Sequence, residues 1–351
     1  MEPTKNFNTT PGMAGENFDD FKAPLFLAWQ INSVCNLGCL HCCEEAGHHI
    51  PGEMTRDQIF TFLHQVREMG IPYVAISGGE PLLHPNFFEV AEFIREAGMS
   101  LKVETNGEFI DDKVVDRFAA LDFRSVQISL DGATAATHEV LRLKGDWKKS
   151  YTAVKKLVEK GVTTEIVFVP TSFNIHEVGE AIDMAHDLGC YGFYTGKIMR
   201  IWRAALNWDK LNPTEEQYKA FFKTLDEKTK QYENKMKVYY YPYDVIEELK
   251  YRLEKPSASL LVVPNGNTKL IGPLPFICGN VKEQSLAEVW ERYKKAWREP
   301  KVIEFTKRVI KDPNLLANQI NGKTYFKVRP LPFSAICRPS AILPWRRHFE
   351  A

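Results

Sequence analysis

Residues 35–43, Cys-Asn-Leu-Gly-Cys-Leu-His-Cys-Cys, closely follow an apolar stretch at 24–33 (PLFLAWQINS). The apolar stretch predicts a first β-strand, and the cysteines lie where that strand ends. Cys35, Cys39 and Cys42 have the spacing C-x3-C-x2-C. Cysteine thiolates are the usual ligands of iron–sulfur clusters, and a four-iron cluster normally takes four of them. Three cysteines therefore leave one iron open, as metal sites that carry out chemistry generally require.

A structural zinc site is the main alternative interpretation of this cysteine group. Zinc sites usually combine two cysteine pairs, or one pair with a later pair of histidines, and His48 and His49 follow closely. Unliganded thiols are the third interpretation. The spacing favours the iron–sulfur cluster. Cys43 is predicted to be a buried neighbouring thiol, because adjacent cysteines cannot easily reach two corners of one cluster.

The composition describes an ordinary globular chain of 351 residues, 44% hydrophobic and 26% charged. Basic and acidic residues number 45 each, so the net charge of zero gives no attraction to nucleic acid or to an anionic membrane. No apolar run reaches about 18 residues, and the first twenty residues lack a signal-peptide core. Seven cysteines, several of them clustered, argue against a secreted disulfide framework and predict a reducing cytoplasm.

Strand and helix patterns alternate from residue 24 to about 195. Thr55 with Gln58 forms a predicted capping box at the first helix, and Asn174 with Glu177 is predicted to cap the helix before the last strand. Motif-like loops follow the first four strands, which favours a barrel, because a barrel gathers its strand ends on one face. Six units predict a partial (β/α)6 barrel of the TIM type. The predicted strands cover residues 24–33, 73–77, 101–104, 125–130, 164–169 and 192–195.

The alternation stops after residue 200, and four segments are predicted. They are a flexible lead-in (1–23), the barrel (24–200), a helical connection (201–255), and a small α+β C-terminal region with its tail (256–351). Asn265-Gly266 suits a tight hairpin turn, and Ser285 with Glu288 forms a capping box. The tail, rich in proline and aromatic residues, is predicted to be an irregular cover.

Short polar motifs follow the second, third and fourth strands. In 77–81 (SGGEP), two glycines can let a ligand approach the backbone, and a carboxylate can accept a hydrogen bond from an ammonium group. Small polar groups in 105–107 (TNG) and 129–132 (SLDG) can reach hydroxyl or carboxylate groups. Taken alone, 105–107 and 129–132 are equally compatible with ordinary turns, and 77–81 is more typical of one. The same holds for Arg142 as a surface charge and for His41 as a plain loop residue.

In their order and placement, these motifs resemble the radical S-adenosylmethionine (SAM) superfamily over residues 25 to about 195. The resemblance implies that Cys35, Cys39 and Cys42 hold one 4Fe–4S cluster whose open iron binds SAM. The reduced cluster would cleave SAM to a 5′-deoxyadenosyl radical, which abstracts hydrogen from a substrate. No catalytic acid or base is indicated. The resemblance implies cofactor contacts from His41, Gly78, Gly79, Glu80, Asn106, Ser129 and Arg142.

The region after residue 256 resembles the SPASM or twitch extension of radical SAM enzymes that mature peptides or cofactors or modify tetrapyrroles. Such extensions usually hold auxiliary clusters with many cysteines. Here only Cys278 and Cys337 are present, with Cys190 in the barrel, so an auxiliary cluster is not expected. Completion of such a site by other residues, a partner or the substrate stays open. The loop after the last strand also resembles this group. Its Arg200, Trp202, Arg203 and Trp208 are candidates for lining a substrate site, with packing in the core as the alternative for the aromatic residues.

The resemblance predicts a radical SAM enzyme of peptide (RiPP) or cofactor maturation. A small metabolite or a tetrapyrrole is the alternative substrate, and a metal-binding accessory protein without catalysis is the alternative class. The expected partners are a flavodoxin- or ferredoxin-type electron donor and a peptide or small molecule, but no nucleic acid and no membrane. About 24 residues precede the first strand, too few for a leader-binding domain, so a peptide substrate would need a separate recognition protein or another binding mode.

Overall fold

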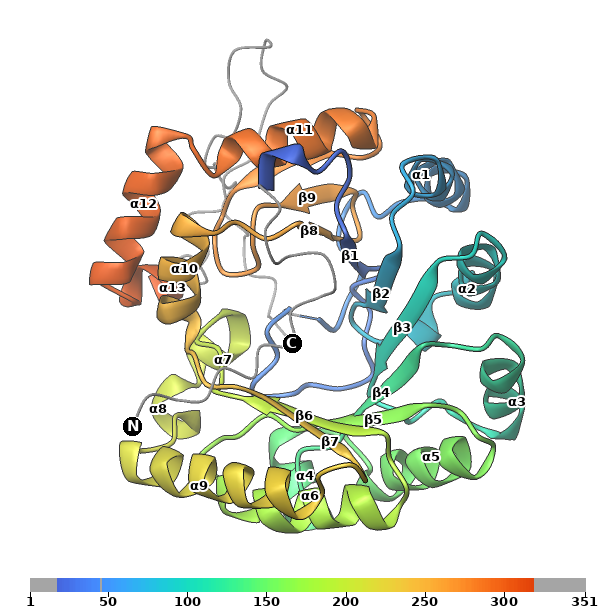
Figure 1. Cartoon of the computed structure of the whole chain (residues 1–351), viewed down its shortest axis with the longest axis vertical. Helices are drawn as coiled ribbons and strands as arrows, with labels where there is room; N and C mark the ends of the chain where they lie inside the picture. The colour runs from blue at the N-terminus through green and yellow to red at the C-terminus, as the bar shows by residue number, and fades with distance from the viewer. Residues whose placement is uncertain (1–17, 45, 319–351) are drawn as a thin grey trace, which may run out of the picture.

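The computed structural model describes residues 18–44 and 46–318 of the chain. In this part, ten strands form one sheet in the order β10-β9-β8-β1-β2-β3-β4-β5-β6-β7 (Figure 1). Strands β1 to β7 are parallel to their neighbours. The strands are β1 (Phe26–Gln30), β2 (Tyr73–Ser77), β3 (Ser100–Thr105), β4 (Ser125–Ser129), β5 (Thr164–Val167), β6 (Gly192–Gly196), β7 (Lys237–Tyr241), β8 (Ser259–Val262), β9 (Asn267–Lys269) and β10 (Ile277–Asn280).

Helices cover the outer side of this curved sheet, and the predicted partial barrel is confirmed (Figure 1). Outward-facing strand residues form the core with them: Trp29 of β1 meets Phe62 of α1 edge to face at 5.5 Å between ring centroids. The helices are α1 (Arg56–Glu68), α2 (Phe87–Glu96), α3 (Asp112–Ala120), α4 (Ala135–Leu141), α5 (Trp147–Glu159), α6 (Val178–Asp187), α7 (Trp202–Leu206), α8 (Trp208–Leu211), α9 (Glu215–Gln231), α10 (Val245–Glu254), α11 (Leu286–Ala296), α12 (Pro300–Lys311) and α13 (Asn314–Asn318).

Two of the three predicted helix caps are confirmed. Thr55 and Ser285 each accept a hydrogen bond from the third residue of the following helix, whose side chain returns the bond. The prediction for Asn174 is wrong: its side chain makes no capping bond to the helix that follows. It instead accepts from the backbone N–H of Thr171 at 2.6 Å and donates to the carbonyl of Asp131 at 2.8 Å. A buried tertiary partner outcompetes the local cap.

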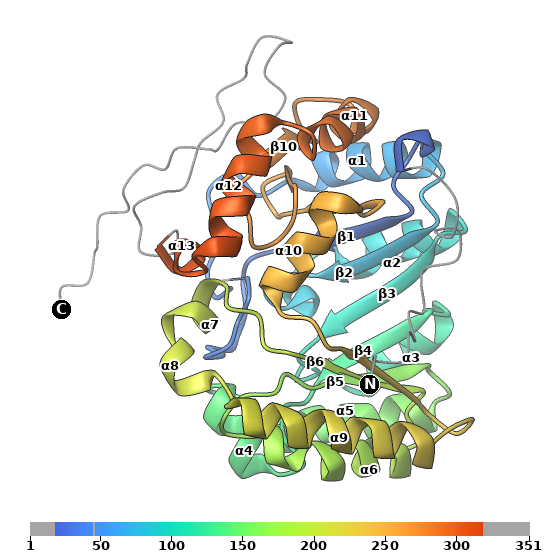
Figure 2. The ribbon, with the colours of Figure 1, turned by 60° about the vertical axis from the view of Figure 1, so that its left-hand side comes forward.

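The sheet extends into both segments beyond residue 200. The predicted helical connection at 201–255 contains β7, which pairs in parallel with β6 over five residues. Strand β8 forms the predicted hairpin with β9 but also pairs in parallel with β1. The C-terminal region therefore continues the barrel sheet. Helices α7, α10 and α12 lie on the side of the barrel away from β2 to β4 (Figure 2).

The described end of the lead-in is anchored to the C-terminal region. The indole of Trp290 on α11 donates to the carbonyl of Phe21 at 2.9 Å, and Arg298 pairs with Asp19. Residues 1–17 of the predicted flexible lead-in, and most of the predicted tail cover with Cys337, lie outside the described residues. No helix among the described residues has the length and apolar character needed to span a membrane.

Candidate active site

The segment that follows β1 and carries the clustered cysteines, residues 31–44 and here called the cysteine loop, is hydrogen-bonded to the loop after β2. Backbone N–H groups of Gly79 and Glu80 donate to the carbonyls of Asn32 and Val34 at 2.9 and 2.8 Å. The side chain of Asn32 returns a bond to the carbonyl of Glu80 at 2.9 Å. The segment that leads into Cys35 is thus held in register with the 77–81 motif.

The two glycines of this motif are required by the chain itself. Gly78 has φ of +149°, and a Cβ there would lie 2.6 Å from the carbonyl oxygen of Asn32. A Cβ on Gly79 would overlap the carbonyl of Val34. The sequence analysis attributed these glycines to the approach of a ligand. In the structure, their lack of a side chain lets the backbone before Cys35 pack against the loop after β2.

Glu80 is fully buried directly beneath this junction. Its carboxylate accepts hydrogen bonds from the hydroxyl of Thr105 at 2.7 Å, the N–H of Asn106 at 2.9 Å and the N–H of Leu82 at 3.1 Å. Burial raises the pKa of Glu80 to about 7, against the lowering effect of these donors. The carboxylate therefore ties the loops after β2 and β3 together.

Asn106 connects the loop after β3 to the cysteine loop. Its side-chain amide donates to Asn36 at 2.8 Å, and Asn36 in turn donates to Glu108 at 2.7 Å. Glu108 also accepts the N–H of Asp146, at the start of α5, at 2.7 Å. Asn36, between the first two cysteines, and Glu108 were not among the predicted site residues, because neither side chain carries a motif of its own.

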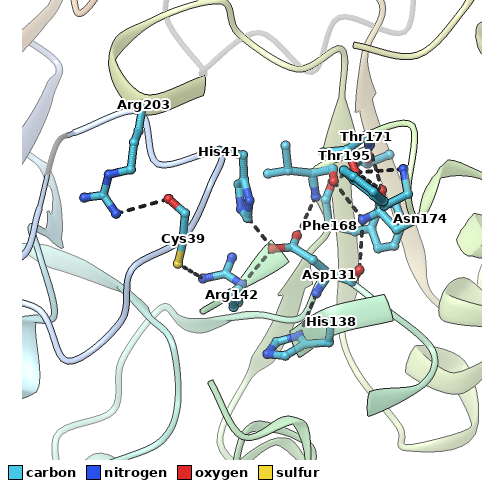
Figure 3. Close-up of polar contacts among 12 residues, drawn as sticks. Cys39, His41, Asp131, His138, Arg142, Phe168, Thr171, Asn174, Thr195 and Arg203 are labelled. Atoms are coloured by element: carbon cyan, nitrogen blue, oxygen red, sulfur yellow. Dashed lines mark hydrogen bonds and ion pairs between the residues drawn. The ribbon is translucent and has the colours of Figure 1, made fainter. Parts of the chain in front are cut away.

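Asp131, after β4, is the central buried charge of the site (Figure 3). Its Oδ2 pairs with Nε of Arg142 at 2.7 Å and with Nε2 of His41 at 3.0 Å. Its Oδ1 accepts the N–H of Val169, after β5, at 2.8 Å. Burial opposes ionisation of Asp131, but the charge of Arg142, together with the smaller effects of His41 and His138, lowers its pKa, so it stays a carboxylate.

The backbone of Asp131 is fixed as firmly as its side chain. Its N–H donates to Nδ1 of His138 at 3.1 Å, and its carbonyl accepts from Asn174. Burial and the nearby charge of Arg142 lower the pKa of His138 to about 4, so this imidazole is neutral. Asp131 stood inside the 129–132 motif, but the sequence pointed to Ser129 of that motif as the contact residue.

Arg142 contacts the cysteine loop at the sulfur of Cys39. Its Nη1 lies 3.7 Å from Sγ of Cys39, in hydrogen-bonding geometry. The backbone of the same segment pairs with the loop, since the N–H groups of Gly38 and Leu40 donate to the carbonyls of Leu143 and Leu141 at 3.0 and 2.8 Å.

Arg203, of α7, binds the cysteine loop from the opposite side (Figure 3). Its Nη1 donates to the carbonyl of Cys39 at 3.1 Å, its Nη2 donates to the carbonyl of Ala46, and its backbone N–H donates to the carbonyl of Cys42 at 3.2 Å. The side chain predicted to line a substrate site thus holds the cysteine loop in shape.

The donor set fits an iron–sulfur cluster. Cys35, Cys39, Cys42 and Cys43 are all free thiols. Burial raises the pKa of Cys35 to about 11 and also raises that of Cys39, while the charge of Arg142 opposes the rise at Cys39. A metal group deprotonates such thiols on binding. No three His, Cys, Asp or Glu side chains in the described part lie close enough together to hold a single metal ion.

His41 and Ser129 complete the predicted set. His41, within the cysteine loop, is buried and contacts Asp131, and its Nδ1 has no partner among the described residues. Ser129 is the last residue of β4 and is partly exposed. Cys43, predicted to be a buried thiol, is partly buried and lies 3.8 Å from a carboxylate oxygen of Glu44.

Polar side chains line the inner side of the barrel below these loops. Lys102 of β3 pairs with Glu165 of β5 at 3.0 Å, and Gln127 of β4 donates to the same carboxylate at 3.3 Å. Glu104, one inward position closer to the cysteine loop than Lys102, has a pKa raised by burial. Sequence reasoning missed this row, although the alternation of apolar and polar residues in 100–105 could have indicated it.

The chain matches the family model of the Radical SAM superfamily over residues 29–185. An AdoMet-dependent heme synthase of Methanosarcina barkeri is 25% identical over 292 residues, covering 77% of this chain and 82% of that protein. The mycofactocin maturase MftC of Mycobacterium ulcerans is 34% identical over 203 residues, covering 57% of this chain and 54% of the maturase. The matching segment therefore spans about half of the maturase.

Two solved structures share the fold. SuiB of Streptococcus suis, bound to the precursor peptide SuiA, has a TM-score of 0.62 at 16% identity, covering 77% of this chain and 65% of SuiB. The structure of anSMEcpe with bound AdoMet has a TM-score of 0.58 at 19% identity, covering 81% of this chain and 83% of anSMEcpe. These two structures support the fold alone. With the cysteine loop joined to the loops after β2, β3 and β4, the match of residues 29–185 to the family model identifies the chain as an enzyme of the radical SAM superfamily.

Proposed function

We propose that this enzyme holds one 4Fe–4S cluster on Cys35, Cys39 and Cys42 and acts in the maturation of a peptide or a cofactor. The observation that carries the proposal is the bonding of the cysteine loop to three motif-bearing loops at one sheet edge. The loop contacts Gly79 and Glu80 after β2, Asn106 after β3 and, through His41, Asp131 after β4. Such an arrangement brings a cluster and its cofactor together at the carboxyl ends of the strands.

A cluster held by these cysteines would supply the one electron that cleaves the C5′–S bond of bound SAM into methionine and a 5′-deoxyadenosyl radical, which would then take a hydrogen from the substrate. The chain's own residues bind and orient. We assign the SAM contacts to His41, the backbone of 78–80, Asn106, Ser129 and Arg142. Glu80, whose carboxylate is buried against three donors, orders the loop that presents this backbone.

A single cluster is part of the proposal. Cys190 and Cys278 are both buried, in the barrel and in the C-terminal region respectively. Neither has a second cysteine beside it in a local sequence motif, which supports the expected loss of an auxiliary cluster.

A low-potential reductant of the flavodoxin or ferredoxin type would supply the electron. Free thiols and such a cluster suit a reducing cytoplasm, and the zero net charge supports neither a nucleic-acid nor a membrane partner.

The substrate would meet the polar row inside the barrel. Glu104, Gln127 and Glu165 offer hydrogen-bond acceptors and donors beneath the cysteine loop, as a peptide or another polar substrate requires. The similarity to MftC supports maturation chemistry.

A tetrapyrrole substrate is the second candidate. The alignment with the heme synthase reaches 77% of this chain, a larger share than the 57% aligned with the maturase. Titration with a tetrapyrrole, followed by its visible absorption, separates the two substrates. Saturable binding favours the second candidate, and co-purification of a peptide favours the first.

The test of the function compares the wild type with the Cys35/Cys39/Cys42→Ala variant after anaerobic reconstitution. We expect about four irons per chain in the wild type and none in the variant, with 5′-deoxyadenosine formed only by the wild type under dithionite. Cys43→Ala is the matched control and should keep its iron. Iron retained by the triple variant would overturn the single-cluster proposal. An intact cluster that never cleaves SAM would favour an accessory protein.

A further inference from the structure

The guanidinium of Arg142 lies between a cysteine sulfur and a buried carboxylate (Figure 3). Nη1 is 3.7 Å from Sγ of Cys39, and Nε is 2.7 Å from Oδ2 of Asp131. The Arg142 side chain is 9% exposed and that of Asp131 is 0% exposed. In such a weakly screened environment the two charges form a dipole whose positive end faces the sulfur.

This arrangement is rigid on both sides. Asp131 is held by the N–H of Val169 and by its bonds to His138 and Asn174. The segment that carries Arg142 follows α4 and is paired through its backbone with the cysteine loop at Gly38 and Leu40. The distance between guanidinium and sulfur is therefore set by the fold on both sides.

We propose that the Arg142–Asp131 pair sets the reduction potential of the cluster held in part by Cys39. The inference rests on the proposed cluster at Cys35, Cys39 and Cys42. Potentials of iron–sulfur clusters follow net charge, burial and hydrogen bonds to the sulfurs. Reduction adds one electron from the external donor to the cluster, with no bond or proton changed. A donor N–H and a positive charge at a ligand sulfur stabilise that added negative charge and raise the potential.

Asp131 affects the reduction potential in the opposite direction, through its contact with Arg142. Its carboxylate orients the guanidinium and partly offsets the positive charge. Removing Arg142 alone would leave Asp131 as an uncompensated negative charge near the cluster, so the potential should fall steeply. Removing the charge of Asp131 should raise it. A loss of structure alone would not give shifts of opposite sign.

Arg203 provides a matched control. It also touches Cys39, but its Nη1 donates to the backbone carbonyl, at 3.1 Å, and not to the sulfur. Arg142→Gln and Arg203→Gln therefore each remove one arginine from the same cysteine. Only the first removes the donor to sulfur.

The experiment is a redox titration of the reconstituted full-length chain without SAM, followed by the electron paramagnetic resonance signal of the reduced cluster. We expect reduction of Arg142→Gln to be at least tenfold less favourable than that of the wild type, which for one electron is a shift of about 59 mV. Arg203→Gln should shift by less than half as much, and Asp131→Asn should shift toward positive potential.

An unchanged midpoint in Arg142→Gln with a full iron content would overturn the inference, as would an equal shift in Arg203→Gln. If Arg142→Gln does not load iron, Asp131→Asn decides: a positive shift supports the inference and an unchanged or negative one overturns it. A wild type without a cluster would be a failure of the proposed function and not of this inference, so iron is counted in every sample.

Discussion

His138 is a neutral imidazole inside the site, and acid should act on the fold through it. Its pKa is lowered to about 4 in the folded chain, whereas an unfolded histidine has a pKa of about 6.5. Between these values the unfolded chain binds a proton that the folded chain does not, so stability falls as pH decreases. From pH 7.5 to 5.5 the loss from this residue should be about 1 kcal/mol.

His138→Asn tests this source of acid sensitivity, because the amide oxygen can replace Nδ1 as the acceptor for the N–H of Asp131. We expect a smaller loss of unfolding free energy from pH 7.5 to 5.5 in this variant, measured by anaerobic urea unfolding. His64→Asn changes an exposed histidine and is the control. Equal acid sensitivity in His138→Asn and the wild type would contradict the argument.

Glu80 should be sensitive to loss of an acceptor and not only to loss of charge. In Glu80→Gln an amide nitrogen replaces one carboxylate oxygen and faces an N–H or O–H donor, leaving at least one buried donor unpaired. We expect a loss of about 1–3 kcal/mol in unfolding free energy and weaker SAM binding, measured by urea unfolding and by calorimetry. Glu159→Gln, on the exposed end of α5, should change neither. Wild-type stability and SAM affinity in Glu80→Gln would show that the three donors do not depend on this carboxylate.

At the scale of elements, the loop after β2 fixes the position of the cysteine loop by close backbone packing and hydrogen bonds. Gly79→Ala would place a Cβ against the carbonyl of Val34 and push the cysteine loop away from the sheet. We expect a several-fold lower iron content after reconstitution, with the helix content from circular dichroism retained. Gly272→Ala is the control, because its Cβ would meet nothing within 4 Å. Full iron loading of Gly79→Ala would show that the loop tolerates the displacement.

The sequence was sufficient for elements whose signals are local. The capping box at Thr55 and the hairpin of β8 and β9 depend on neighbouring residues and were predicted correctly. The expected tight turn with positive φ at both Asn265 and Gly266 was wrong in detail, because only Gly266 has a positive φ. Strand β7, a short and largely unburied KVYYY stretch, was missed because only its pairing with β6 makes it a strand. Asn174 and Asp131 were misjudged for the same reason. They are hydrogen-bonded to each other across 43 residues of the chain and meet only in the fold.

At the scale of the whole molecule, the C-terminal region and the barrel share one sheet. Strand β8 lies against β1, the strand that leads into the cysteine loop, and Leu260 of β8 is fully buried. Lys269 of β9 lies close enough to Glu44 that its charge opposes the rise in the pKa of that carboxyl on burial. A region that completes the sheet and reaches the cysteine loop should not unfold by itself.

Cooperative unfolding follows from this shared sheet. Leu260→Ala should lower the unfolding free energy by about 2–5 kcal/mol, since it leaves a cavity beside β1. Because β8 and β1 belong to one unit, the far-ultraviolet dichroism and the cluster absorbance should change at one urea concentration, and the variant should shift both equally. Leu206→Ala, at a site 55% exposed, should shift neither. If dichroism changed in two steps, with Leu260→Ala moving only one of them and the cluster absorbance staying in place, the C-terminal region would be an independent domain that rests against the barrel. One common transition would instead mean that changes in the C-terminal region reach the cysteine loop through β1.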